Sequence, residues 1–258
     1  MNADAMATAT RSTAPRPAEC AVFELRQYTL HPRARERLIA LFEREFVESQ
    51  EACGASVVGT FRDLDDPDRF VWLRGFADRP ARRRALADFY GGPVWKAHRD
   101  AANATMIDSD DVLLLRPAWT GSIADLDPCL RPAPDRDEAG ESLVIARIYP
   151  FDAQVGPDFV DWFRREAMPL FEALGAQTAA TLVTEEAKND FTALPVREGE
   201  HVFTWLARFG SHAAYARFFE AVTHARRWND ELLPELQRRL SGKPPLLRLA
   251  PTSRSLLR

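Results

Sequence analysis

The chain has 258 residues, 46% of them hydrophobic, which is enough to bury the core of one large domain or two small ones. Its 34 basic and 38 acidic residues give a formal net charge of −4, so there is no general electrostatic argument for binding nucleic acid or an anionic membrane surface. The sequence contains no run of about 18 apolar residues and no signal-peptide core. We therefore expect a cytoplasmic protein without nucleic-acid or membrane partners.

The N-terminal segment, residues 1–20, is rich in Ala, Thr, Pro and Arg, and we expect it to form a disordered tail. The three cysteines, Cys20, Cys53 and Cys129, are odd in number and show no CxxC spacing. This pattern argues against a disulfide framework and against a structural zinc site, and it favours free thiols in a reducing compartment.

The first predicted element is a strand over residues 22–30, where the residue types alternate. Alternation places Phe23 and Leu25 on one face of the strand and Arg26 and Tyr28 on the other. The second face therefore carries polar and aromatic side chains that need partners of their own.

Five further elements complete a first unit, residues 21–120, with the order β-α-β-β-α-β. They are a helix over residues 34–53 that ends at Gly54, strands over residues 55–62 and 69–76, a helix from about Pro80 that is interrupted at residues 91–93, and a strand over residues 112–116. The Asp and Pro residues between the two middle strands suit a hairpin connection.

The second part of the chain, residues 141–258, is predicted to be a divergent copy of the first unit. Tyr28 recurs as Tyr149, and Trp72 recurs, at a larger offset, as Trp205. The difference between the two offsets is assigned to a longer hairpin loop in the second unit, because an insertion costs least there.

Residues 121–140, dense in Pro, Asp and Gly, are the predicted linker between the units. A single unit lays both helices on one sheet face and leaves the other bare, so two units can bury their bare faces against each other. The predicted fold class is α+β: two tandem ferredoxin-like units packed sheet to sheet as an intrachain α+β barrel. The residues expected to line its interior are Arg26, Tyr28, Trp72, Arg74 and Phe76 in the first unit and Arg147, Tyr149, Trp205 and Phe209 in the second.

Three stretches of the first unit carry a family resemblance: FELRQYTLHP at residues 23–32, FVWLRGFAD at residues 70–78, and FYGGPVWKAHRDAANATMIDSDDVLLLRPA at residues 89–118. In these residues the chain resembles the NIPSNAP family of the dimeric α+β barrel superfamily, as a bacterial type with two tandem units. The resemblance implies the barrel fold, but it brings no established reaction and assigns no catalytic residue. The wider superfamily includes cofactor-free monooxygenases, isomerases and haem proteins, which is an analogy of fold.

The main candidate site lies on the predicted helix that follows residue 93. Helical spacing places Trp95 and Arg99 on one stripe, with His98 and Asn103 at its margins. In the second copy, at the offset that aligns Trp72 with Trp205, leucines stand at the positions of Arg99 and Asn103, as plain packing requires. His98 and Arg99 are the catalytic candidates, because an imidazole transfers protons near neutral pH and a guanidinium holds an oxyanion. The residues predicted to bind substrate are Arg26, Tyr28, Phe61, Trp72, Arg74, Trp95 and Asn103.

Three functions stay open on the sequence. The first is an enzyme without an organic cofactor that performs proton transfer or oxygenation on a small, apolar, anionic ligand. The second is a non-catalytic binding or interaction protein, which a lumen filled by large side chains would favour. The third is a haem protein with His98 or His224 as the axial ligand. No metal site is predicted, because the histidines lack metal-ligand spacing, and a homodimer stays open as well.

Overall fold

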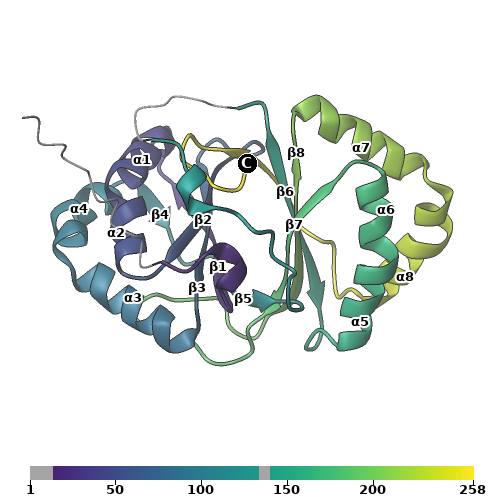
Figure 1. Cartoon of the computed structure of the whole chain (residues 1–258), viewed down its shortest axis with the longest axis horizontal. Coiled ribbons are helices and arrows are strands. Elements are labelled where there is room, and N and C mark those ends of the chain that lie inside the picture. Colours follow the sequence, from purple (N-terminus) through teal and green to yellow (C-terminus); the bar gives the residue numbers. More distant parts are fainter. Residues whose placement is uncertain (1–13, 134–139) are drawn as a thin grey trace, which may run out of the picture.

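The computed structural model describes residues 14–133 and 140–258, which form one antiparallel barrel flanked by helices. Figure 1 shows the helices of the first unit, α1 to α4, on the left and those of the second unit, α5 to α8, on the right, with the strands between them. The α+β barrel predicted from the sequence is confirmed.

The described residues of the first unit contain five strands and four α-helices. In chain order they are β1 (Val22–Leu30), α1 (Arg35–Leu41), α2 (Val47–Ala52), β2 (Ser56–Asp63), β3 (Arg69–Phe76), α3 (Arg79–Gly91), α4 (Pro93–Asn103), β4 (Met106–Asp108) and β5 (Val112–Pro117). A π-helical turn, Phe42–Phe46, joins α1 to α2, so these pieces make up the first helix predicted from the sequence. The side chain of Asp78 caps α3 by accepting a hydrogen bond from the backbone N–H of Ala81.

The second unit repeats this order without a counterpart of β4 among its described residues. Its elements are β6 (Leu143–Phe151), α5 (Pro157–Trp162), α6 (Met168–Ala173), β7 (Gln177–Thr184), β8 (His201–Phe209), α7 (His212–His224), α8 (Leu233–Arg239) and β9 (Leu246–Pro251). Two π-helical turns precede α6 and α8, at Phe163–Ala167 and Trp228–Leu232.

The spacing between equivalent elements increases in two steps along the chain. The first step lies between β2 and β3, because the loop after β7, which separates β7 from β8, is longer than its counterpart. The second step is a single position and lies before β5, whose first residue, Val112, is equivalent to Leu246 of β9. This step coincides with the π turn Trp228–Leu232, which holds one residue more than an α-helical turn, whereas α4 is α-helical throughout.

The barrel closes through two seams, each between a strand of one unit and a strand of the other. Its eight strands follow the order β1-β3-β2-β9-β6-β8-β7-β5 and return to β1, while β4 pairs with the end of β1. At one seam Phe61 of β2 lies opposite Pro251 of β9, and at the other Leu115 of β5 lies opposite Thr184 of β7. Neither sheet therefore has a free edge at these seams.

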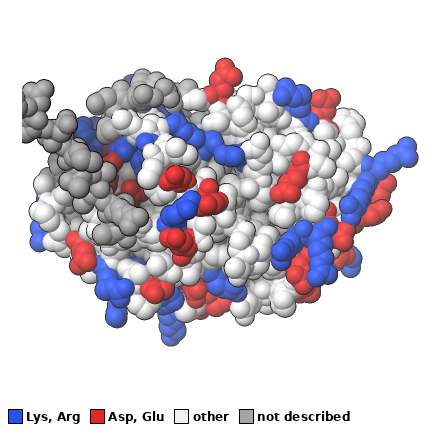
Figure 2. All heavy atoms as spheres, in the orientation of Figure 1, with Lys and Arg blue, Asp and Glu red and all other residues white. Residues whose placement is uncertain are grey.

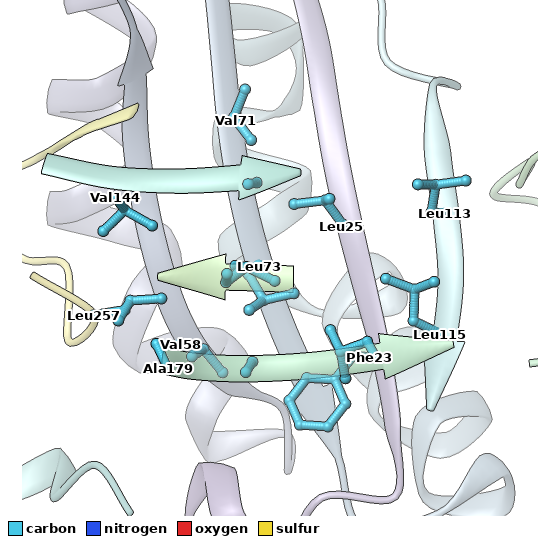
Figure 3. Close-up of a cluster of buried hydrophobic side chains, with 14 of the residues drawn as sticks. Phe23, Leu25, Val58, Val71, Leu73, Leu113, Leu115, Val144, Ala179 and Leu257 are labelled. Carbon is cyan, nitrogen blue, oxygen red and sulfur yellow. The ribbon is translucent and has the colours of Figure 1, made fainter. Parts of the chain in front are cut away.

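The interior of the barrel is packed with apolar side chains. Figure 3 shows Phe23, Leu25 and Leu73 of the first unit and Val144 of the second converging on the same space. Leu257, close to the C-terminus, joins this cluster, and its backbone N–H donates to the carbonyl oxygen of Val58. The lumen is thus the main core of the protein.

The residues predicted to line the lumen lie on the opposite face of the sheets, against the helices, so that prediction is wrong. Tyr28 and Trp72 pack with Phe42 and Phe89. The reason is steric: a closed barrel of eight strands is just wide enough to be filled by side chains, and mainly aliphatic side chains, with Phe23 and Phe61, fill it. The space under the helices takes most of the aromatic rings and the buried arginines. The residues concerned are Arg26, Tyr28, Trp72, Arg74, Phe76, Arg147, Tyr149, Trp205 and Phe209.

The predicted tail and linker are partly integrated in the fold. Residues 1–13 and 134–139 lie outside the described residues. Pro17–Glu19 form a short 3-10 turn and Cys20 is buried in the lumen cluster, so these residues do not belong to a disordered tail. Within the predicted linker, the Ser122 hydroxyl donates to the carbonyl oxygen of Thr181 at 2.8 Å, which ties that segment to β7.

The visible surface mixes both signs of charge. Figure 2 shows Lys and Arg side chains interspersed with Asp and Glu, in keeping with the small net charge. None of the helices in the described part of the chain is both long and apolar enough to cross a membrane.

Candidate functional site

Glu24 of β1 is the centre of a buried cluster of charged side chains in the first unit. Its Oε2 accepts hydrogen bonds from Arg26 Nη1 and Arg74 Nη2, both at 2.7 Å, and its Oε1 accepts one from Arg82 Nε at 2.6 Å. All four side chains are fully buried. Arg74 also donates to Gln50 Oε1 at 2.7 Å. The sheet brings Glu24 and Arg74 together, because the two residues are paired in the β1–β3 register.

The cluster carries more positive than negative charge. Arg82 reaches a second carboxylate, that of Asp190, at 2.7 Å, so three guanidinium groups face two carboxylates. Burial opposes the ionisation of Glu24, yet the guanidinium groups of Arg74, Arg26 and Arg82 hold its pKa well below the usual range. The excess positive charge favours a further anion nearby.

The described residues of the second unit form no such cluster. The positions equivalent to Glu24, Gln50, Arg74 and Arg82 are occupied by Ile145, Phe171, Ala207 and Tyr215. Buried ion pairs can often be replaced by well-packed apolar residues without loss of stability, and the second unit shows that this fold packs without them. The cluster of the first unit therefore points to a role beyond packing.

An apolar cavity lies beside the cluster, between the sheet and the helices of the first unit. Its walls include Tyr28 and Trp72 from the sheet, Phe42 and Phe46 from the π turn, and Tyr90 and Trp95 from α3 and α4. The ring centroids of Phe42 and Trp72 are only 4.8 Å apart. The free volume is about 30 Å³, which is room for a water molecule or two.

Two polar groups of the cavity wall lack an acceptor among the described residues. Trp72 is buried and its Nε1–H has no hydrogen-bond partner. The hydroxyl oxygen of Tyr28 accepts a hydrogen bond from Arg26 Nε at 3.0 Å, so its own hydrogen remains available for donation. Burial raises the pKa of Tyr28, which keeps the hydroxyl protonated. The cavity is therefore complementary to a ligand with an acceptor oxygen.

The structure brings together five of the nine predicted site residues. Tyr28, Trp72 and Trp95 line the cavity. Arg26 and Arg74 lie beside its inner end, with their guanidinium carbons 5.6 and 4.9 Å from the centroid of the Trp72 ring. This group forms the candidate binding site.

The other four predicted residues lie elsewhere. Phe61 is in the lumen, on the opposite face of the sheet. His98 is half-buried outside the cavity wall, with Nε2 3.4 Å from Glu45 Oε2. Arg99 and Asn103 are exposed on α4. Neither catalytic candidate lines the cavity: the His98 ring contacts Phe46 of the cavity wall, with ring centroids 6.4 Å apart, and Arg99 is exposed.

The π turn Trp228–Leu232 explains why comparison of the two copies pointed to Arg99 and Asn103. Beyond this turn equivalent positions lie one residue further apart, as they do in β5 and β9. Leu236 is then the counterpart of Ala102 rather than of Asn103, and both Leu236 and Ala102 are buried. The asymmetry between the copies on this helix is thus smaller than an alignment without the π turn suggests.

Sequence reasoning missed Glu24, Gln50 and Arg82, which complete the cluster. One signal was present: alternation in β1 places Glu24 on the same face as Arg26, at ion-pairing distance along the strand. Asp190 gave no such signal, because it reaches Arg82 from a loop 108 positions further along the chain.

Residues 23–120 match the sequence model of the NIPSNAP family. These residues form a NIPSNAP domain. The match begins at the second residue of β1 and ends just after β5, so the NIPSNAP domain coincides with the first unit and contains the cavity. The family resemblance seen in the sequence is confirmed.

Two solved structures are similar to the NIPSNAP domain and the second unit together. One is a proposed monooxygenase from Lactobacillus acidophilus, with 13% identity, a TM-score of 0.56, and coverage of 90% of this chain and 94% of the other. Another is an anthrone oxidase-like protein, with 11% identity, a TM-score of 0.54, and coverage of 92% and 94%. At these identities the similarity shows the fold alone. No curated protein sequence gives a significant match.

Proposed function

We propose that the NIPSNAP domain binds a small, largely apolar molecule with an anionic oxygen, in the cavity between its sheet and its helices. The main support is a pair of donors in a largely apolar wall, the Tyr28 O–H and the Trp72 Nε1–H, for which the described residues supply no acceptor. A buried donor without an acceptor costs roughly 1–3 kcal/mol. A ligand oxygen placed between the two donors removes this cost.

The charged cluster favours an anionic oxygen over a neutral one. Arg26 donates to the hydroxyl oxygen of Tyr28, and this hydrogen bond polarises the O–H group and strengthens it as a donor. The unbalanced positive charge behind the two donors acts in a region of low dielectric, where it is weakly screened. A carboxylate, phenolate or enolate satisfies both features.

Entry of a ligand requires the cover of the cavity to move, because the free volume is only about 30 Å³. The cover is well suited to this movement. Within α4, which the structure describes in full, Ala102 alone is buried, and Gly91 and Gly92 join α4 to α3. An element with few buried contacts opens at low cost, so displacement of Tyr90 and Trp95 provides the space.

For this ligand we propose oxygenation without an organic cofactor. The described side chains that line the cavity include no carboxylate and no imidazole, so the substrate is one that is already an anion at neutral pH, such as a stabilised enolate. Dioxygen adds to an anionic carbon that still bears one hydrogen, and a proton from water gives the hydroperoxide. Loss of that carbon's hydrogen as a proton, with cleavage of the O–O bond, leaves a carbonyl oxygen on the carbon and releases the second oxygen atom as hydroxide, which the lost proton converts to water. The substrate is the reductant and dioxygen the oxidant. The names of the two similarly folded proteins are in keeping with this chemistry.

A non-catalytic binding protein is the second candidate, and the packed lumen favours it. Phe23, Leu25 and the side chains around them fill the interior of the barrel (Figure 3). In this alternative the protein retains its ligand in the cavity under α4 without converting it.

Native mass spectrometry of the protein purified from its own host tests the binding site. Tyr28→Phe and Trp72→Phe should each reduce the retained ligand by about tenfold, because each removes one hydrogen bond to an anion. Trp162→Phe is the matched control, since Trp162 packs on Arg239 away from this cavity. Equal retention in all variants, or no retained small molecule in the wild type, would overturn the proposal.

An oxygen electrode then separates the two candidates. With the identified ligand, oxygen uptake in proportion to product formation supports oxygenation, and Tyr28→Phe should slow it. Retention without oxygen uptake selects the binding protein.

A further inference from the structure

The second unit contains a larger cavity in the equivalent place, between its sheet and α7 and α8. The free volume is about 240 Å³, which accommodates a small organic molecule without rearrangement. Its walls are mainly aromatic: the ring centroid of Phe171 lies 4.9 Å from that of Trp205 and 4.9 Å from that of Trp228. Phe219 lines the cavity and is 55% exposed, so the cavity opens to solvent beside α7.

Arg147 of β6 lines this cavity without an acidic partner among the described residues. Its hydrogen bond to the backbone is long, from Nη1 to the carbonyl oxygen of Pro244 at 3.4 Å. In the first unit the equivalent Arg26 is neutralised by Glu24 at 2.7 Å. Ile145 occupies the position of Glu24 in the second unit, which explains why Arg147 is left without this counter-charge.

Tyr149 adds a donor next to this guanidinium. It is buried in the same wall, and burial raises the pKa of its hydroxyl to about 12, an effect that Arg147 partly opposes. The hydroxyl is therefore protonated at neutral pH. A cation and a neutral donor stand together at one side of a cavity whose other walls are apolar.

We propose that this cavity binds an aromatic monocarboxylic acid, with the carboxylate on Arg147 and Tyr149 and the ring system among the surrounding aromatic side chains. A guanidinium offers parallel N–H groups that match the two oxygens of a carboxylate. Aromatic walls favour a flat ring through edge and stacking contacts. A single guanidinium calls for one negative charge, and a partly buried charge without a partner is costly. The site does not depend on the proposed function of the first unit.

Isothermal titration calorimetry of the intact protein with naphthoate, and with naphthalenemethanol as its neutral analogue, tests this site. Arg147→Gln should weaken the binding of naphthoate at least about tenfold, the loss of one charge-assisted contact, and should change the binding of naphthalenemethanol by less than about twofold. Val222→Phe should abolish the binding of both compounds, because Val222 lines the cavity and a larger ring would occupy it.

Trp162→Phe is the matched control, because the Trp162 ring packs on Arg239 and does not line this cavity. It should leave the affinity for naphthoate unchanged. Melting curves followed by circular dichroism establish that each variant is folded. Unchanged affinity in folded Arg147→Gln, or no heat of binding with the wild type at millimolar naphthoate, would overturn the proposal. A loss of affinity in Trp72→Phe alone would also overturn it, because it would place the acid in the other cavity.

Discussion

The Nε atom of Arg82 lies 2.6 Å from Oε1 of Glu24, and the same guanidinium also binds a carboxylate of the second unit. Its Nη1 lies 2.7 Å from Asp190 Oδ1, in the long loop between β7 and β8. Arg79, one turn earlier on α3, donates to the carbonyl oxygen of Ala187 in the same loop. The loop of the second unit therefore covers the charged cluster of the NIPSNAP domain.

Replacing Glu24 by Gln should destabilise the fold strongly, because it leaves buried guanidinium groups without their central counter-charge. Removing one partner from a buried ion pair costs about 3–5 kcal/mol, which equilibrium unfolding in urea measures. Glu36→Gln is the matched control, since Glu36 pairs with Arg62 and its side chain is 61% exposed. It should cost less than about 1 kcal/mol. Similar losses in both variants would contradict a structural role for the cluster.

The same carboxylate makes the fold sensitive to acid. The folded-state pKa of Glu24 is below its unfolded value, because the surrounding guanidinium groups outweigh the effect of burial. Its contribution to stability is therefore present above the unfolded pKa of about 4.3 and is lost as the pH falls from there towards the folded pKa. Below about pH 5, melting temperatures should fall more steeply for the wild type than for Glu24→Gln. Parallel curves would show that the carboxylate is not linked to folding.

Cys20 and Cys129 should differ sharply in their reaction with iodoacetamide. Burial raises the pKa of the Cys20 thiol to about 12, and alkylation requires an accessible thiolate. Cys129 is exposed. At mildly alkaline pH we expect immediate labelling of Cys129 and labelling of Cys20 only after denaturation, as read by peptide mass spectrometry. Rapid labelling of Cys20 in the native protein would show that the lumen cluster opens readily.

Substitution of Phe61 should affect stability, whereas substitution of Trp72 should affect ligand retention. The two residues lie on opposite faces of the same sheet. Phe61→Leu should lower the free energy of unfolding by about 1–2 kcal/mol, since it leaves a gap in the lumen, and should not affect ligand retention. Trp72→Phe should reduce ligand retention with a smaller effect on stability. Urea unfolding and native mass spectrometry on both variants test the pair. Loss of ligand from Phe61→Leu would mean that the cavity extends through the sheet.

The order of the elements could be predicted because each strand and helix has a clear local signal. The alternation over residues 22–30 and the apolar spacing over residues 34–53 are examples. The π turns could not be predicted, since a wider turn changes the apolar spacing by a single position. The turn Trp228–Leu232 affected the site prediction most, because it shifted the comparison of the two copies by one residue.

The orientation of the strands is a different problem. Phe23 and Glu24 are both fully buried, so alternation in β1 separates two chemically distinct faces without telling which one meets the helices. The predicted residues of the strands were therefore grouped correctly, with the exception of Phe61, but placed in the lumen. The lumen of an eight-stranded barrel has room only for the side chains that fill it. It takes Leu25 and Leu73, and the layer between the sheet and the helices takes Trp72.

The two seams of the barrel determine how far the two units can differ in sequence. A NIPSNAP domain alone would expose the edges of β2 and β5 and the apolar face that Figure 3 shows, and two identical copies would have to close both edges against each other. In such a pair every substitution appears twice. Joining the units in one polypeptide removes this constraint, so that Glu24 can persist on one side of the barrel while Ile145 replaces it on the other. Fusion thus gives the protein two pockets that can specialise separately.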